Sequence, residues 1–225
     1  MDHSHHEHSH HQDDVKNEVK VNVNYDGNKL FIDVKDENNK APELTVSHEE
    51  IFHLIIVSAN LEQYYHLHPL AIGDGLFEQE IDLKEGLYKV FVDISPKYLG
   101  YQITPIDLQV NDATQSEPAN LQPESVLQKT KNNVTVDLHI DKLRVNEPAT
   151  LSYEVSGGTL QPYLGALGHV IILDEKIEQF IHVHPVADDK TIFHAQFTKK
   201  GTYKVWAEFK VEEEVLVFPF VVEVK

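Results

Sequence analysis

Three histidines occur twice along this chain with the same spacing. The first set is His53, His66 and His68, and the second set is His169, His182 and His184. Imidazole nitrogens bind zinc and copper(II). The chain has no cysteine and a single methionine, so thiolate ligands are excluded and a thioether-rich copper(I) site is not expected. Imidazole and carboxylate groups remain as metal ligands.

A β-hairpin would bring the first three histidines to one face of a sheet. Its natural turn is residues 59–62, and closing the hairpin there places His53 directly opposite His68. Directly opposed residues of an antiparallel pair have Cβ atoms about 4.5–5.5 Å apart. His66 lies two residues before His68 and therefore points to the same face. We expect three imidazoles in one small patch.

The second copy repeats this arrangement. A turn at residues 175–178 places His169 opposite His184, with His182 on the same face. Without a metal, three crowded rings gain little and repel one another once they are protonated. The alternative interpretation is that His-x-His-Pro is a fragment of hairpin packing that the duplication copied. We favour binding of zinc or copper(II), because burying three converging imidazoles without a partner costs free energy.

A fourth ligand for each site could come from Asp93 and Glu208. These residues hold equivalent places in the two copies, within otherwise apolar runs. Two alternatives stay open. Alternation along a strand could turn both carboxylates to solvent, and water could fill the fourth position.

The remaining histidines have no counterpart in the other copy. His48, His139 and His194 are expected to be ordinary surface or hydrogen-bonded histidines. Residues 1–16 form a His-rich tail that cannot bury a core and is expected to be disordered. Such tracts capture zinc, copper or nickel loosely, and residues 1–3 could wrap copper(II) in a square-planar nitrogen set. The alternative is an added leader. The tail histidines are His3, His5, His6, His8, His10 and His11.

An internal repeat defines the domains. HLIIVSANLEQYYHLHP starts at His53, and HVIILDEKIEQFIHVHP starts at His169. The stretch between the copies is rich in Asn, Gln, Ser and Pro, which is typical of a linker. We therefore expect a first domain over 17–112, a linker over 113–129 and a second domain over 130–225.

Short β runs separated by turns predict an all-β protein of two tandem immunoglobulin-like sandwiches. Tyr88 and Tyr203 follow a glycine at the start of a β run, where such sandwiches place a tyrosine corner. Trp206 is expected in the core. The expected strands are 18–24, 29–35, 51–58, 62–68, 76–83, 87–94 and 102–110, then 133–140, 149–155, 167–174, 178–184, 191–197, 202–210 and 215–224.

The formal net charge of −18 disfavours binding to nucleic acid and to anionic membrane surfaces, and it favours the approach of cations. No apolar run has the length of a transmembrane span. If Met1 is the native start, the chain is expected to be cytoplasmic. A chain that opens on a polar histidine cluster also looks like a mature, extracytoplasmic protein that has lost its signal.

The two His-x-His-Pro hairpins, each followed by a Gly-x-Tyr strand, resemble those of tandem immunoglobulin-like, His-rich cell-envelope proteins of Gram-positive bacteria. Many of these are exported lipoproteins. The resemblance covers both domains and implies an extracytoplasmic role in copper or zinc handling. This chain differs in having no lipobox cysteine. The matching positions are 66–69 and 182–185, with Gly86, Tyr88, Gly201 and Tyr203.

The leading hypothesis is a metal-binding protein for buffering, delivery or sensing, with a metal transporter or chaperone as partner. The chain is not expected to be an enzyme. A zinc-dependent hydrolase is the weaker alternative, because no general base, nucleophile motif or substrate cleft is evident. A metal-independent surface interaction or adhesion module is the third hypothesis.

Overall fold

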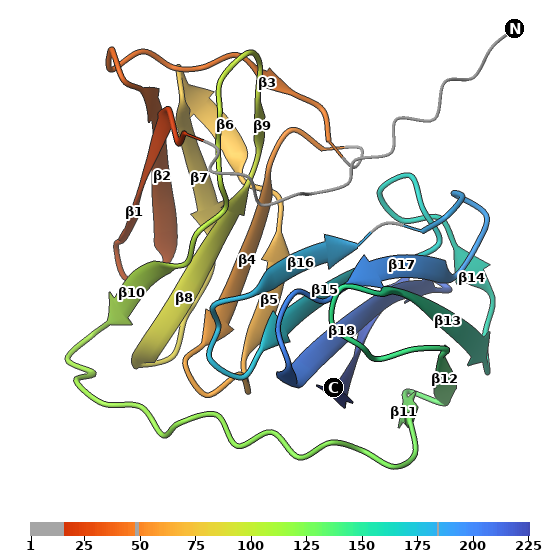
Figure 1. Ribbon diagram of the computed structural model, residues 1–225. Coiled ribbons are helices and arrows are strands. Elements are labelled where there is room, and N and C mark those ends of the chain that lie inside the picture. Colours follow the sequence, from red (N-terminus) through yellow and green to blue (C-terminus); the bar gives the residue numbers. More distant parts are fainter. Residues whose placement is uncertain (1–15, 48–49, 184) are drawn as a thin grey trace, which may run out of the picture.

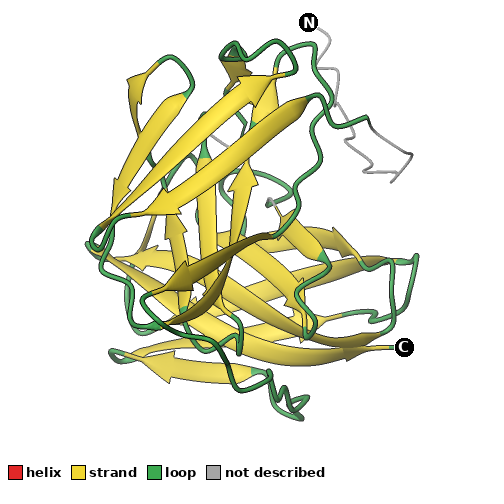
Figure 2. Ribbon diagram, turned by 90° about the vertical axis from the view of Figure 1, so that its left-hand side faces the viewer, coloured by secondary structure: helices red, strands yellow, loops and turns green. Residues whose placement is uncertain are grey.

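The computed structural model describes residues 16–47, 50–183 and 185–225, and these ranges contain strands and loops (Figures 1 and 2). Within these ranges, no helix has the length and apolar character that crossing a membrane requires.

The first domain is a sandwich of two antiparallel sheets. Its outer sheet has the order β1-β2-β7-β6, formed by β1 (Val19–Tyr25), β2 (Lys29–Asp36), β7 (Leu76–Glu80) and β6 (Leu70–Gly73). Its inner sheet has the order β10-β8-β4-β5, formed by β10 (Ile106–Val110), β8 (Gly86–Asp93), β4 (His53–Ser58) and β5 (Tyr64–Leu67). The short strands β3 (Leu44–Thr45) and β9 (Ser95–Pro96) pair with each other.

The second domain repeats this plan. One sheet has the order β11-β12-β13-β17, formed by β11 (Gln128–Lys131), β12 (Val134–Ile140), β13 (Pro148–Ser156) and β17 (Ile192–Gln196). The other has the order β14-β18-β15-β16, formed by β14 (Leu160–Gln161), β18 (Gly201–Val211), β15 (His169–Asp174) and β16 (Phe180–Val183), and β19 (Glu214–Val224) pairs with β18. Each domain encloses its own apolar core.

The predicted fold class is confirmed: the chain is two tandem immunoglobulin-like β-sandwiches. Every expected strand is present, with its ends shifted by a few residues, apart from position 184, which lies outside the described residues. The strands β3, β6, β9, β11 and β14 were not expected. They are two to four residues long, too short to show a period of two. The first residues of β11 lie in the stretch that we expected to be linker.

The predicted tyrosine corners are also confirmed. The hydroxyl of Tyr88 donates a hydrogen bond to the carbonyl oxygen of Lys84 at 2.9 Å, and that of Tyr203 donates to the carbonyl oxygen of Lys199 at 2.8 Å. Both bonds reach back four residues, as this corner requires. The shared corner supports the equivalence of β8 and β18.

A third apolar core lies between the two domains. Along β4, Leu54 and Ile56 face the core of the first sandwich, while Ile55 and Val57 face the second domain. Figure 1 shows β4 and β5 beside β15 and β16. Trp206 is buried, as expected, but it packs in this third core and not in the core of its own sandwich. The sheets that carry the histidines therefore cover each other.

Reciprocal ring stacks hold this interface. Tyr64 stacks on Trp206 with ring centroids 4.8 Å apart, and Phe91 stacks on Phe180 at 4.8 Å. Tyr64 and Phe180 hold equivalent positions in the repeat, and so do Phe91 and Trp206. Each domain thus presents the same patch to the other, as two subunits do about a twofold axis.

Candidate metal centre

The first three histidines meet where β4 begins and β5 ends. The observed register pairs Leu54 with Leu67 and Ile55 with His66, which is the predicted register. His53 Nδ1 lies 3.1 Å from His66 Nε2 and 3.1 Å from His68 Nε2. Two nitrogens bound to one tetrahedral zinc at 2.0–2.1 Å are about 3.3 Å apart. His53 Nδ1 therefore lies close to metal-ligand spacing from both other nitrogens, and the three ligand atoms, all within 4.8 Å of one another, form a group that could hold an ion.

Hydrogen bonds fix the tautomers of two of these rings. His53 Nε2 lies 3.0 Å from the carbonyl oxygen of Ser47, which can only accept, so this nitrogen carries the proton. In the same way, His66 Nδ1 donates to Glu208 Oε2 at 3.0 Å. His53 Nδ1 and His66 Nε2 then both present lone pairs across 3.1 Å. A metal ion accepts both lone pairs at once, whereas in these tautomers no proton lies between the two nitrogens.

The second domain repeats this proton arrangement. The pairing of Val170 with Val183 and of Ile171 with His182 is again the predicted register. His169 Nε2 donates to the carbonyl oxygen of Tyr163 at 2.9 Å, and His182 Nδ1 donates to Asp93 Oδ2 at 2.7 Å. These tautomers put lone pairs on His169 Nδ1 and His182 Nε2. The third predicted ligand, His184, lies outside the described residues.

The two carboxylates sit beside the histidines but reach across the interface. Asp93 is the cross-strand neighbour of His53, and Glu208 is that of His169. The alternative that both face solvent is wrong, because Asp93 is 8% exposed and Glu208 is 3% exposed. Each carboxylate instead binds a histidine of the other domain. Their role as fourth ligands stays a prediction.

Electrostatics favour the neutral imidazole at His53, His68 and His169. Burial lowers the pKa of His53 and His169 and lowers that of His68 to about 3, and neighbouring histidines add to each effect. Burial alone would raise the pKa of Glu208, but the contact with His66 and the hydrogen bonds that His66 and Tyr64 donate to this carboxylate outweigh it, so its pKa is lowered. Neutral rings beside an ionised carboxylate are the protonation states that metal binding needs.

The sequence did not reveal Tyr64 as part of the site. Its hydroxyl donates to Glu208 Oε1 at 2.6 Å, and burial together with the Glu208 charge raises its pKa well above the usual value. The sequence does, however, indicate that the histidine-bearing sheets are covered on both faces. Residues 54–57 and 170–173 are continuous apolar runs without alternation, which is typical of strands buried on both faces.

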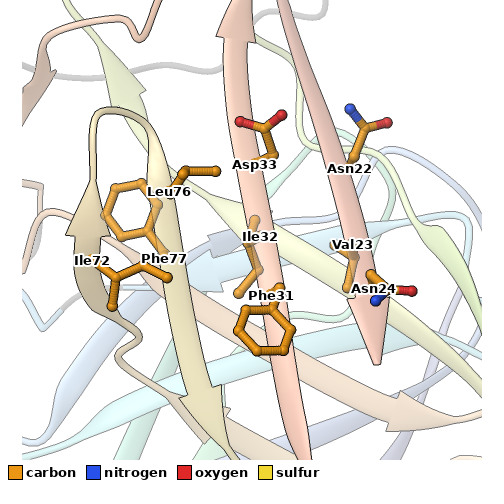
Figure 3. A pocket seen from close by; sticks show the side chains of 9 residues that line it. All are labelled: Asn22, Val23, Asn24, Phe31, Ile32, Asp33, Ile72, Leu76 and Phe77. Carbon is orange, nitrogen blue, oxygen red and sulfur yellow. The ribbon is translucent and has the colours of Figure 1, made fainter. Parts of the chain in front are cut away.

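Two further histidines of the described residues lie on the surface. His139 and His194 are exposed, in agreement with their assignment as ordinary histidines. His48 and the tail histidines lie outside the described residues. A hollow on the outer sheet of the first domain, lined by Phe31, Ile72 and Leu76 among others, contains no histidine (Figure 3).

The chain belongs to the family described as a domain of unknown function, DUF8832, whose model matches residues 4–112 and 128–225. No curated protein matches the chain. This family match does not assign the chain to His-rich metal-binding proteins, so that resemblance has no support beyond the residues that suggested it.

Two solved structures are similar in fold. A segment of two fibronectin type-III domains from chicken tenascin is 11% identical, with a TM-score of 0.29, over 91% of this chain and 98% of that one. The Escherichia coli adhesin FdeC is 14% identical, with a TM-score of 0.27, over 93% of this chain and 64% of that one. At these values neither structure indicates a ligand or partner for this chain.

Proposed function

We propose that this DUF8832 member binds transition-metal ions, zinc or copper(II), at one histidine site per domain, and serves in metal buffering, delivery or sensing without catalysing a reaction. The observation that carries this proposal is the approach of His53 Nδ1 and His66 Nε2 to 3.1 Å while the other nitrogen of each ring donates a hydrogen bond. In metal sites, a hydrogen bond from the nitrogen that does not bind the metal orients the histidine and raises its basicity.

The ligand set limits the choice of metal. Nitrogen and carboxylate ligands without sulfur suit zinc and copper(II) and disfavour copper(I). The net charge of −18 supports capture of cations from solution. We further propose that the protein acts outside the cytoplasm and exchanges its ion with a metal transporter or chaperone, as its resemblance to His-rich envelope proteins implies.

Calorimetric titration with zinc and copper(II) tests the proposal. The full chain and a variant lacking residues 1–12 should both show two tight sites, because the hairpin ligands lie outside the tail. The double variant His66→Ala/His68→Ala should lose one site. His139→Ala/His194→Ala is the matched control, since both rings are exposed, and it should keep both sites. Loss of all tight binding on deletion of the tail would exclude the hairpin sites.

A second candidate is a metal-independent interaction module. The observation that favours it is the group of exposed apolar side chains on β6 and β7, where Leu70 is 71% exposed and Ile72 is 52% exposed, beside the hollow in Figure 3. Grouped apolar side chains on a surface can mark an interaction site. A ligand that binds only the folded state raises the melting temperature, so a melting temperature unchanged by zinc and by copper(II) would favour this candidate.

A further inference from the structure

The histidines of the two domains share one buried space. Within the first set, ring centroids are 4.9–5.3 Å apart. Across the interface, His182 lies 5.0 Å from His53 and 5.6 Å from His66 by the same measure. The rings of the two domains are therefore almost as close to one another as those of one domain. Residues of either domain can therefore contact the histidines of both sets.

Each set also depends on a carboxylate from the other domain. Glu208, on β18 of the second domain, accepts from His66 Nδ1 at 3.0 Å and from the Tyr64 hydroxyl at 2.6 Å. Asp93, on β8 of the first domain, accepts from His182 Nδ1 at 2.7 Å. Because the two halves are repeats, the same contact occurs twice in reciprocal form. The carboxylates are exchanged between the domains.

These exchanged contacts are shielded from water. The side chains of His66 and Glu208 are 2% and 4% exposed, and those of His182 and Asp93 are 4% and 11% exposed. A charged acceptor makes a hydrogen bond roughly twice as strong as a neutral one, and a low local dielectric strengthens it further. The bond to Glu208 therefore holds the His66 ring with Nε2 3.1 Å from His53 Nδ1, and the bond to Asp93 holds the His182 ring with its centroid 5.0 Å from that of His53.

We propose that the two sites form one composite centre at the domain interface, in which Glu208 positions the metal ligand His66 and Asp93 positions the metal ligand His182. This inference rests on the proposed metal-binding function and adds that each site needs the other domain. It differs from a fourth-ligand role within one domain, in which Asp93 would serve the first site and Glu208 the second. The two assignments predict opposite results.

Zinc titration of single-site variants separates these assignments. His182→Ala disables the second site and leaves the first, and His68→Ala does the reverse. In the His182→Ala chain, Glu208→Gln should weaken zinc binding by about 10- to 100-fold, the usual loss when an orienting partner is removed, and Asp93→Asn should leave it unchanged. In the His68→Ala chain, Asp93→Asn should cause that loss and Glu208→Gln should not.

Two further measurements guard against a merely structural effect. The absorption spectrum of bound cobalt(II) should keep its intensity in the site that each substitution spares. Tyr64→Phe removes only one hydrogen bond to Glu208 and introduces the residue already present at the equivalent Phe180. In the His182→Ala chain it should fold and weaken the first site by about threefold, the effect of one hydrogen bond.

The outcomes distinguish this inference from the proposed function. Zinc binding with losses in the same domain as the substituted carboxylate, or with no losses, would overturn the composite centre and leave the function intact. Absence of tight zinc binding in the unsubstituted chain would overturn both.

Discussion

The two histidine sets have the same positions in their hairpins but different support across the interface. His66 in the first set rests on a glutamate that also binds the hydroxyl of Tyr64. His182 in the second set rests on the shorter Asp93, and Phe180, in the place of Tyr64, has no hydroxyl to offer. The histidine positions are thus the same in the two copies, while the residues behind them differ. The two sites should therefore bind the same ion with different affinity.

Removing one ligand from each set should have the largest effect. His66→Ala and His182→Ala should each lose one equivalent of tightly bound zinc, because a tetrahedral site needs its protein ligands in place. Elemental analysis after dialysis measures the ratio of zinc to protein. A ratio that stays near two in either variant would break the comparison by showing that this ring binds no ion.

Truncating a stacked ring at the interface should have the next largest effect. Trp206→Ala should destabilise the metal-free protein by about 3–5 kcal/mol, the usual cost of truncating a buried aromatic side chain, and Phe91→Ala should cost less because its ring is smaller. Urea unfolding measures both effects. Phe31→Ala on the outer sheet, where the side chain is 36% exposed, is the control with a small expected change. Equal stability of all three variants would contradict a packed interface.

Acid should weaken the metal-free protein. The pKa values of His53, His68 and His169 are lowered on folding, so below about pH 6.5, the value of free histidine, the unfolded chain binds more protons than the folded one. Stability should be complete above that pH and fall as the pH decreases toward the folded values. Unfolding midpoints in urea between about pH 8 and pH 5 measure this, and His68→Ala should reduce the slope. A flat profile would contradict the lowered pKa values.

The smallest effect should come from giving the second site the hydroxyl group that the first site already has. Phe180→Tyr gives the second domain the hydroxyl that Tyr64 supplies in the first. A new hydrogen bond to Asp93 would act on the zinc only through His182, so zinc affinity at the second site should rise modestly, by about threefold, toward that of the first. Calorimetry in the His68→Ala chain measures it. Weaker binding would mean that the hydroxyl finds no acceptor there.

The hairpin registers and tyrosine corners were predictable because each depends on local rules. Alternation along a strand and the position of a turn fix which residues oppose His53 and His169. The partners of Asp93 and Glu208 were not predictable, since they depend on how two separate surfaces meet. Spacing placed both carboxylates near their own histidines, and only the docked domains show that each binds a histidine of the other. The apolar run at residues 54–57 indicated a covered face without identifying what covers it.

The reciprocal stacks of Tyr64 on Trp206 and of Phe91 on Phe180 imply that a lone domain of this kind carries a self-complementary surface. Such a domain would be expected to form a twofold homodimer, whose assembly depends on its concentration. Covalent joining through residues 111–127 replaces that encounter with an effective concentration in the millimolar range. The fused pair thus stays assembled on dilution, and its halves are free to acquire unlike side chains on either side of one shared interface.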